Sequence, residues 1–217
     1  MKASLAVSIL AAVLATGSCL QCEVCSGTGH NCTGSMQPCA AGEDSCGIII
    51  TEVTMAEVKS HSIFKGCVPS SQCRAGLFSV DLGYVMTRRR SVICCVGDAC
   101  KTATVPAANT TLNGWHCPGC FMGNAGHCHE QTVNCGGPES QCIEATGTIM
   151  TAGNLTQSIM KGCASESVCA QLKVGPGTVA GMSTNLTFAR CTVASGTVDI
   201  AAGLLPALTG LLLKLLS

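Results

Sequence analysis

Apolar residues form one continuous stretch near each end of the chain, and polar residues interrupt them throughout the interior. The N-terminal stretch follows Lys2 and gives way to small polar residues just before Cys19. A charged start, an apolar run and a small-residue end are typical of a secretory signal peptide. We therefore predict that residues 1–19 are a signal peptide cleaved after Cys19. A bacterial lipoprotein box, in the letters TGSC, is the weaker alternative.

The second stretch is an apolar run of 17 residues that ends at Leu216. Small residues followed by an apolar tail are typical of a glycolipid anchor signal, so we predict this role for residues 195–217. The expected attachment residue is Ser195, with Ala194 or Gly196 as alternatives. A membrane-spanning helix is less favoured, because the run is at the short limit for a span and has no basic flank. An amphipathic or buried tail is the remaining alternative.

Between these ends, the alternation of apolar and polar residues predicts β-hairpins. The segments GIIITEVTMAEV (47–58) and SHSIFKG (60–66) are rich in β-branched residues and can pair as two strands. Residues 143–162 alternate similarly around the turn-forming letters TAGN. Residues 74–93 and 170–190 predict a further hairpin in each half. No apolar repeat of 3.6 residues is present in the interior, so we predict an almost entirely β structure.

The cysteines show that the interior is a repeat. Eight of them in each half are separated by 2, 6, 6, 6, 20, 5 and 20 residues and by 2, 7, 6, 6, 20, 5 and 21 residues. The letters KGCVPSSQC (65–73) also correspond to KGCASESVC (161–169). Such self-similarity indicates an internal duplication. The two sets are Cys22, Cys25, Cys32, Cys39, Cys46, Cys67, Cys73 and Cys94, and Cys117, Cys120, Cys128, Cys135, Cys142, Cys163, Cys169 and Cys191.

The two copies differ at their ends. The first copy has an additional pair, Cys95 and Cys100, which the second copy lacks. A polar segment that contains proline and a glycosylation sequon separates the copies. We predict a first domain at residues 20–101, a linker at 102–116 and a shorter second domain at 117–194.

Composition indicates an extracellular, disulfide-bonded protein. The 217 residues include 19 cysteines and only 3% aromatic residues, so the domains bury little and need covalent cross-links. Cleavage after Cys19 leaves 18 cysteines, an even number that suits full pairing. The net charge is zero and only 11% of residues are charged, so no basic footprint for nucleic acid is present. We interpret the short run Arg88–Arg90 as a solvated fingertip or strand face.

The segment HCPGCFMGNAGHCH (116–129) contains three cysteines and three histidines and suggests a zinc site or a redox pair. The repeat argues against both, because Cys117, Cys120 and Cys128 align with the first three cysteines of the other copy. Zinc requires thiolates, and in an oxidising compartment these sulfurs are expected in disulfides. The chain also has no Ser–His–Asp signature, phosphate loop or paired carboxylates at helical spacing. We expect no enzyme activity, no metal site and no cofactor, and we expect these histidines to be ordinary surface residues.

Four sequons for N-glycosylation are present, and we expect two or three of them to be used. The one between the copies is the best candidate, and the first is the weakest because a disulfide cysteine separates its Asn from its Thr. The four asparagines are Asn31, Asn109, Asn154 and Asn185.

Taken together, the cysteine pattern resembles the three-finger fold of the lymphocyte-antigen-six and urokinase-receptor family. The letters LQCEVC (20–25), the cysteine gaps and the closing CCVGDAC (94–100) carry this resemblance. Two tandem copies with KGC before a five-residue gap, and a shortened second copy, look like the gamma-type phospholipase A2 inhibitors in particular. The resemblance implies a mainly β protein of two tandem, disulfide-rich three-finger domains.

The resemblance also implies a disulfide pairing, which the sequence alone could not choose because eight cysteines already allow 105 arrangements. The implied pairs are Cys22–Cys46, Cys25–Cys32, Cys39–Cys67, Cys73–Cys94, Cys95–Cys100, Cys117–Cys142, Cys120–Cys128, Cys135–Cys163 and Cys169–Cys191.

Two functions are compatible with the resemblance. The first is a protein that inhibits or captures secreted phospholipase A2 by covering the enzyme with its finger surfaces, without catalysis. The second is a glycolipid-anchored receptor or adhesion protein on the outer face of the plasma membrane that binds another protein. A modulator of neurotransmitter receptors is a less favoured third. The sequence singles out no finger as the partner-binding surface.

Overall fold

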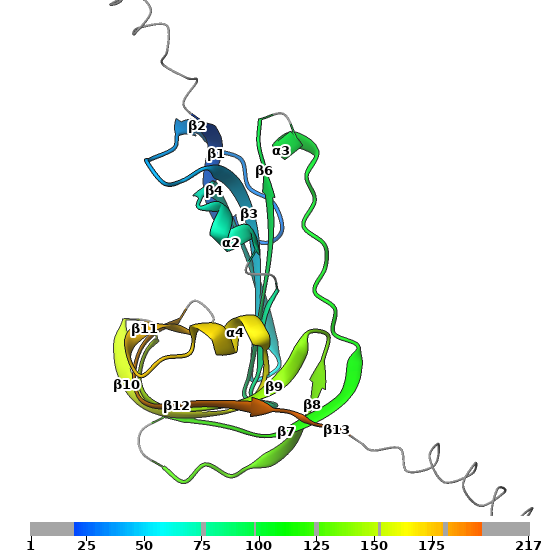
Figure 1. The fold of residues 1–217 in the computed structure, drawn as a ribbon, viewed down its shortest axis with the longest axis vertical. Helices are drawn as coiled ribbons and strands as arrows, with labels where there is room; N and C mark the ends of the chain where they lie inside the picture. Colours follow the sequence, from blue (N-terminus) through cyan, green and yellow to red (C-terminus); the bar gives the residue numbers. More distant parts are fainter. Residues whose placement is uncertain are drawn as a thin grey trace, which may run out of the picture.

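Figure 1 shows the computed structural model of the chain, in which the first half of the sequence stands upright and the second half lies across its lower end. The predicted signal peptide and the tail from residue 197 onward lie outside the described residues. The structure describes residues 20–196 except 75–76, 98, 124–125, 152 and 180–181.

The first half forms three antiparallel hairpins, or fingers, which we call the first module. The fingers are β1–β2, β3–β4 and β5–β6, and two short helices accompany them. The elements are β1 (Gln21–Thr28), β2 (Ser35–Pro38), β3 (Ser45–Met55), β4 (Val58–Val68), α2 (Ser70–Arg74), β5 (Phe78–Asp81), β6 (Met86–Cys95) and α3 (Ala99–Thr102).

The second half repeats this arrangement, and we call it the second module. Its fingers are β7–β8, β9–β10 and β11–β12, with one short helix and a terminal strand. The elements are β7 (Leu112–Gly123), β8 (Gln131–Gly136), β9 (Glu139–Thr151), β10 (Asn154–Ser165), α4 (Glu166–Gln171), β11 (Gly175–Val179), β12 (Met182–Val193) and β13 (Ser195–Gly196).

The mainly β fold of tandem three-finger domains is confirmed, and so are the hairpins expected within 47–66, 74–93, 143–162 and 170–190. Two details differ from expectation. The described residues contain three short helices, and α2 and α4 begin within the equivalent five-residue gaps of the KGC motifs. A helix of five or six residues is too short to show an apolar repeat. Strand β7 also begins at Leu112, inside the segment expected to be a linker, because this residue pairs with Gly136 of β8.

Nine disulfides hold the bases of the fingers together, with Cα–Cα distances of 5.2 to 6.0 Å. They are the nine pairs that the family resemblance implies. By restricting the unfolded chain, each closed loop contributes roughly 2 to 4 kcal/mol, the longer loops most. The pairs are Cys22–Cys46, Cys25–Cys32, Cys39–Cys67, Cys73–Cys94, Cys95–Cys100, Cys117–Cys142, Cys120–Cys128, Cys135–Cys163 and Cys169–Cys191.

The two modules share one sheet and one hydrophobic core. Strand β5 of the first module pairs with β10 of the second through Val80 opposite Ala164 and Asp81 opposite Cys163. The strand order therefore runs without interruption from β2 to β11. The shared core combines side chains of the third finger of the first module with those beneath α4. Its largest members are Phe78, Val80, Leu82 and Met86, and Ile143, Ile149, Met160, Val168 and Leu186.

Candidate functional site

The junction between the modules determines which fingers remain free. Glu139, at the start of β9, is fully buried and accepts hydrogen bonds from the hydroxyl of Ser79 and from the backbone N–H of Gly136 (2.9 Å). A guanidinium nitrogen of Arg89 lies 3.7 Å from the Glu139 carboxylate and 3.4 Å from that of Asp81. Burial raises the pKa of both carboxyl groups, and their hydrogen bonds and Arg89 offset part of this effect.

Helix α4 and Ser165, the last residue of β10, hold the opposite face of the same finger. The hydroxyl of Ser167 donates to the carbonyl oxygen of Leu77 (2.7 Å), and the backbone N–H of Ser79 donates to the hydroxyl of Ser165 (3.1 Å). Val168 is buried in the shared core. The third finger of the first module is thus in contact with the second module on both faces, and its stem is not available to a partner protein.

The run Arg88–Arg90 lies in this third finger, and the prediction that it forms a solvated fingertip or strand face is wrong. Arg88, Arg89 and Arg90 are all partly buried in β6, a strand with a neighbour on each side. Burial lowers the pKa of Arg88 and of Arg90. The guanidinium of Arg90 lies over the ring of Phe78, 5.5 Å from its centroid. In a central strand, successive side chains extend to opposite faces of the sheet, and a long arginine side chain can bury its aliphatic stem on either face. A short charged run in such a strand therefore does not indicate exposure.

Some of the exposed apolar side chains lie at the fingertips. The tip of the central finger of the first module carries Met55 and Val58, and the third finger carries Tyr84, which is 70% exposed. A hydrogen bond from the N–H of Ala56 to the carbonyl oxygen of Val85 (3.1 Å) joins these two tips. We call Met55, Val58 and Tyr84 the tip patch. The central finger of the second module also ends in exposed apolar residues, Met150 and Leu155.

A groove continues from the tip patch onto the second module. Tyr84 and Val85 form one wall, and Phe121, Met122 and His129 belong to the other. Aromatic and methionine side chains are enriched at protein interfaces, and the exposed ones here lie on a rigid, disulfide-bonded support. The tip patch and this junction groove together are the candidate protein-binding surface. The sequence did not single these residues out, because the groove forms only where the two modules meet.

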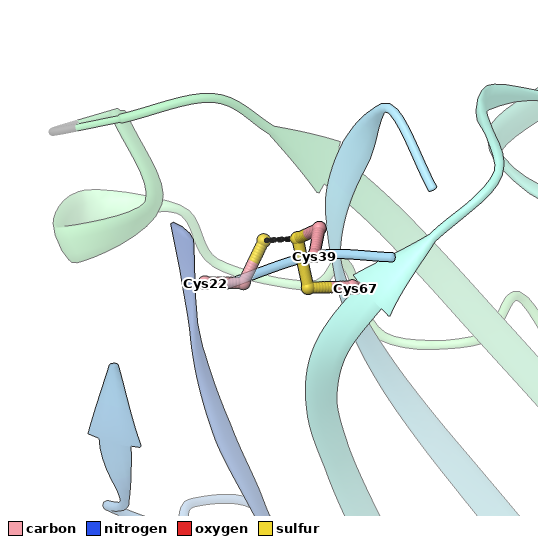
Figure 2. Close-up of side chains that lie close together, drawn as sticks. All are labelled: Cys22, Cys39 and Cys67. Atoms are coloured by element: carbon pink, nitrogen blue, oxygen red, sulfur yellow. Dashed lines mark hydrogen bonds between the residues drawn. A yellow bond between two sulfur atoms is a disulfide. The ribbon is translucent and has the colours of Figure 1, made fainter. Parts of the chain in front are cut away.

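The cysteines of the 116–129 segment are all disulfide-bonded. The described residues contain two groups of three cysteines whose sulfurs converge, one in each module. Figure 2 shows the group of the first module, in which the Cys22 sulfur lies 3.3 Å from the Cys39 sulfur and Cys39 is bonded to Cys67. Disulfide sulfurs are not thiolates, so these groups are covalent cores of the finger bases and are not suited to bind zinc.

The predicted modification residues lie at accessible places. The asparagines of all four sequons are exposed, and Asn109 lies between α3 and β7. Ser195 and Gly196 form β13, which pairs with His116 and Trp115 of β7. Ala194 is buried. Ser195 is therefore the exposed member of the three anchor candidates. No helix among the described residues is long and apolar enough to span a membrane.

Comparison with known proteins agrees with this architecture. The profile of the phospholipase A2 inhibitor family matches residues 20–102, and that of the u-PAR/Ly-6 domain matches residues 113–195. A gamma-type phospholipase A2 inhibitor chain from Gloydius brevicaudus siniticus is 37% identical over 80% of this chain and 88% of its own. Phospholipase A2 inhibitor NAI of Notechis ater is 35% identical over 78% of this chain and 86% of its own.

A further relative, the 25 kDa phospholipase A2 inhibitor chain of Naja kaouthia, is 35% identical over 71% of this chain and 84% of its own. Among solved structures, mouse TEX101 covers 80% of this chain and 99% of its own at 16% identity, with a TM-score of 0.30. This score is too low to support a comparison of the folds.

Proposed function

The chain belongs to the phospholipase A2 inhibitor family of tandem u-PAR/Ly-6 domains, and on this premise we propose that it binds and inhibits secreted phospholipase A2. The observation that supports this most is the extent of the match, because 88% of a named inhibitor is covered. The inhibition is steric: the candidate surface covers the enzyme and prevents it from reaching phospholipid. No residue of this chain acts on the lipid.

The tip patch and the junction groove supply the contacts in this proposal. Their side chains can desolvate a partner surface without ordering a loop, because the hairpins that carry them are held by disulfides and by the shared sheet. The third finger of the first module contributes its tip, while its stem is used to join the modules.

The test is hydrolysis of phospholipid vesicles by secreted phospholipases of several groups, with and without the mature protein. We expect inhibition at stoichiometric protein. Changing Tyr84→Ser together with Met55→Ser removes two exposed anchors and should weaken inhibition about tenfold or more. Val174→Ser is the matched control, since Val174 is similarly exposed but lies before β11, outside the candidate surface. If micromolar wild-type protein leaves every enzyme fully active, the proposed function is wrong.

The extracellular location is part of the same proposal. Nine disulfides require an oxidising compartment, which supports removal of residues 1–19 as a signal peptide. We propose N-glycans on the exposed Asn109, Asn154 and Asn185. Asn31 is also exposed but is followed directly by the disulfide-bonded Cys32.

Attachment to the outer face of the plasma membrane by a glycolipid is a second proposal, and it is compatible with the first. The exposed position of Ser195, the first residue of β13, supports it. An anchor there would hold the second module beside the membrane, with the finger bases of the first module facing away. Mass spectrometry of the mature C-terminus is the test: a chain that ends near Ser195 with glycan and lipid supports anchoring, and an intact Ser217 overturns it. Anchoring alone would also suit a receptor for another protein, and the vesicle assay separates that function from inhibition.

A further inference from the structure

Two arginines of β6 share one face of the sheet and lack a counter-charge. Successive side chains of a strand extend to opposite faces, so Arg88 and Arg90 lie on one face and Arg89 on the other. Among the described residues, the ion pairs of this run belong to Arg89 alone, which lies near Asp81 and Glu139. Arg88 and Arg90 are therefore two neighbouring positive charges without a carboxylate partner.

The contacts of Arg90 show which face this is. Its guanidinium lies 5.5 Å from the centroid of the Phe78 ring and donates a hydrogen bond to the side-chain oxygen of Gln72 on α2 (3.4 Å). Phe78 is directly opposite Arg90 in the ladder, and Val80 is directly opposite Arg88. Phe78 and Val80 both belong to the shared core. The two arginines thus extend beside buried apolar side chains, where a charge is less well hydrated than on an open surface.

Arg88 is the less satisfied of the two. Its Nε atom is buried and has no hydrogen-bond partner. Its terminal nitrogens also have no acceptor among the described residues, but they are not buried, so they are open to solvent. Its neighbours across the strands, Val53 and Val80, have apolar side chains. Burial lowers the pKa of Arg88, and the positive charge of Arg90 lowers it further, which shows that the two charges repel each other.

We infer that Arg88 and Arg90 form a binding site for a small tetrahedral oxyanion, which is a phosphate or sulfate group. Residues two apart on a strand are separated by about 7 Å, so two arginine side chains of this length can contact one anion between them. The planar guanidinium matches such an anion, because it donates two parallel hydrogen bonds to a pair of oxygens. The anion would accept the open N–H groups of Arg88 and remove the repulsion between the two charges.

The surroundings favour a free ion or a short phosphate ester over a large ligand. Strand β6 has β3 on one side and β5 on the other, and α2 and α4 both lie on the face that carries the two arginines (Figure 1). A small anion can approach the strand between the helices, whereas a flat bilayer surface would meet the helices first. The inference does not depend on the inhibition of phospholipase.

The second module provides an internal comparison. Counted back from the last matched cysteine, the residues of β12 that correspond to Arg88 and Arg90 are Asn185 and Thr187. Neither carries a charge, so the proposed site exists in the first module only.

Thermal unfolding of the mature protein in phosphate and in chloride buffers of equal ionic strength tests the proposal, and phosphorus NMR measures the affinity. A ligand that binds only the folded chain raises the midpoint of unfolding, and we expect a rise of about 3 °C at about 10 mM phosphate. Arg88→Gln and Arg90→Gln should each weaken phosphate binding about tenfold or more. Arg88→Lys should weaken it less, because lysine keeps the charge but loses the planar fork. Lys173→Gln is the matched control, since it removes one exposed positive charge after α4, outside β6.

The chloride buffer separates binding from packing. Arg88→Gln removes the repulsion, so in chloride this variant should be at least as stable as the wild type, and only phosphate should reverse the order. If Arg88→Gln is less stable than the wild type in both buffers and its midpoint rises with phosphate as much as that of the wild type, the arginines only pack and the inferred site does not exist. Equal rises in all variants would show a general effect of the salt and would also overturn the site.

Glycerol phosphate and vesicles that contain phosphatidic acid distinguish the sources of the anion. Binding of the soluble ester alone, lost in Arg88→Gln, identifies a site for free ions and short esters. Additional binding of the vesicles, also lost in Arg88→Gln, extends the site to lipid headgroups. The inhibition assay is carried out in phosphate-free buffer, so failure of either proposal leaves the other intact.

Discussion

The two modules place the same carboxylate in opposite environments. In each module, the residue after the fourth matched cysteine donates its backbone N–H to the carboxylate of the glutamate three residues further along the chain. The donor and acceptor are Ala40 and Glu43 in the first module (3.1 Å) and Gly136 and Glu139 in the second (2.9 Å). Glu43 remains partly exposed, whereas Glu139 is fully buried beneath the third finger of the first module. A local turn motif has thus become the centre of an interface between modules.

The helices that follow the KGC motifs show the same divergence. The second module has Ser165, Ser167 and Val168 where the first module has Pro69, Ser71 and Gln72. The three former residues hold β5 of the other module, but the side chain of Gln72 is exposed and accepts a hydrogen bond from Arg90 (3.4 Å). Ser167 and Ser71 are the same residue type, so the substitutions at the other two positions distinguish the base that receives a finger from the one that does not.

The outer edge of the second module differs from the edge of the first module that forms the junction. Strand β11 is at the end of the strand order and contains Pro176, which has no N–H to donate to a further strand. Strand β5, at the equivalent edge of the first module, has no proline and pairs with β10. Of the two equivalent edges, one pairs with a strand of the other module, and the other carries a proline that opposes further pairing.

Removing the two equivalent glutamates should have very unequal effects. Glu139→Ala leaves Arg89 near Asp81 alone and deprives the Ser79 hydroxyl of its buried acceptor, so we expect a loss of about 3 kcal/mol in the free energy of unfolding. Glu43→Ala removes one exposed hydrogen bond and should cost about 1 kcal/mol or less. Urea denaturation of both variants gives the two values.

Hydrogen–deuterium exchange should locate the larger effect in β5 and β10, the strands that join the modules. Equal losses for the two variants, or faster exchange confined to the turn before β9, would show that Glu139 serves only its local turn.

Exchanging the helix residues should have a smaller effect in the same direction. Val168→Gln puts an amide without a partner into the shared core and should cost about 2 kcal/mol. The reverse substitution, Gln72→Val, is at an exposed position and should change stability by about 0.5 kcal/mol or less. The midpoint of thermal unfolding measures both. If the two substitutions cost the same, the core beneath α4 does not distinguish the modules.

The individual hairpins could be predicted because each one leaves its own local pattern. Cysteine spacing and β-branched runs mark the paired strands, and both copies repeat them. The junction leaves no comparable pattern. Val80 alternates with polar neighbours as it would in any half-buried strand, and nothing local shows that Ala164 is opposite it. Contacts between two residues so far apart in the sequence depend on how two folded units fit together.

The same reason explains which residues were misjudged. The Arg88–Arg90 run was predicted to be exposed because its counterparts, Glu139 and Phe78, belong to other strands and carry no local mark of the contact. Conversely, the 116–129 segment concentrates histidines and cysteines, yet its cysteines are structural. The histidines that do meet, His30 and His61, share no motif and are brought together by the pairing of β1 with β4.

The smallest expected effect is a pH dependence that arises at the junction between the modules, where Glu139 is buried. Burial raises the pKa of Glu139 above its ordinary value of 4.5, so the folded protein binds a proton at this carboxyl more readily than the unfolded chain does. The stabilisation from this proton is complete below about pH 4.5 and is lost as the pH rises through the raised pKa. Asp81, whose pKa burial also raises, contributes in the same direction.

Glu139→Gln isolates this contribution, because glutamine keeps the size of the side chain and an acceptor for Ser79 but does not titrate. As the pH is lowered from 8 to 5, the free energy of unfolding of the wild type should increase relative to that of the variant. Other carboxylates, such as Glu23 beside Lys65, have a lowered pKa and act in the opposite sense, but they cancel in the difference between wild type and variant. A difference that is flat with pH would mean that Glu139 is already solvated, and that the two modules are joined less tightly than their shared sheet indicates.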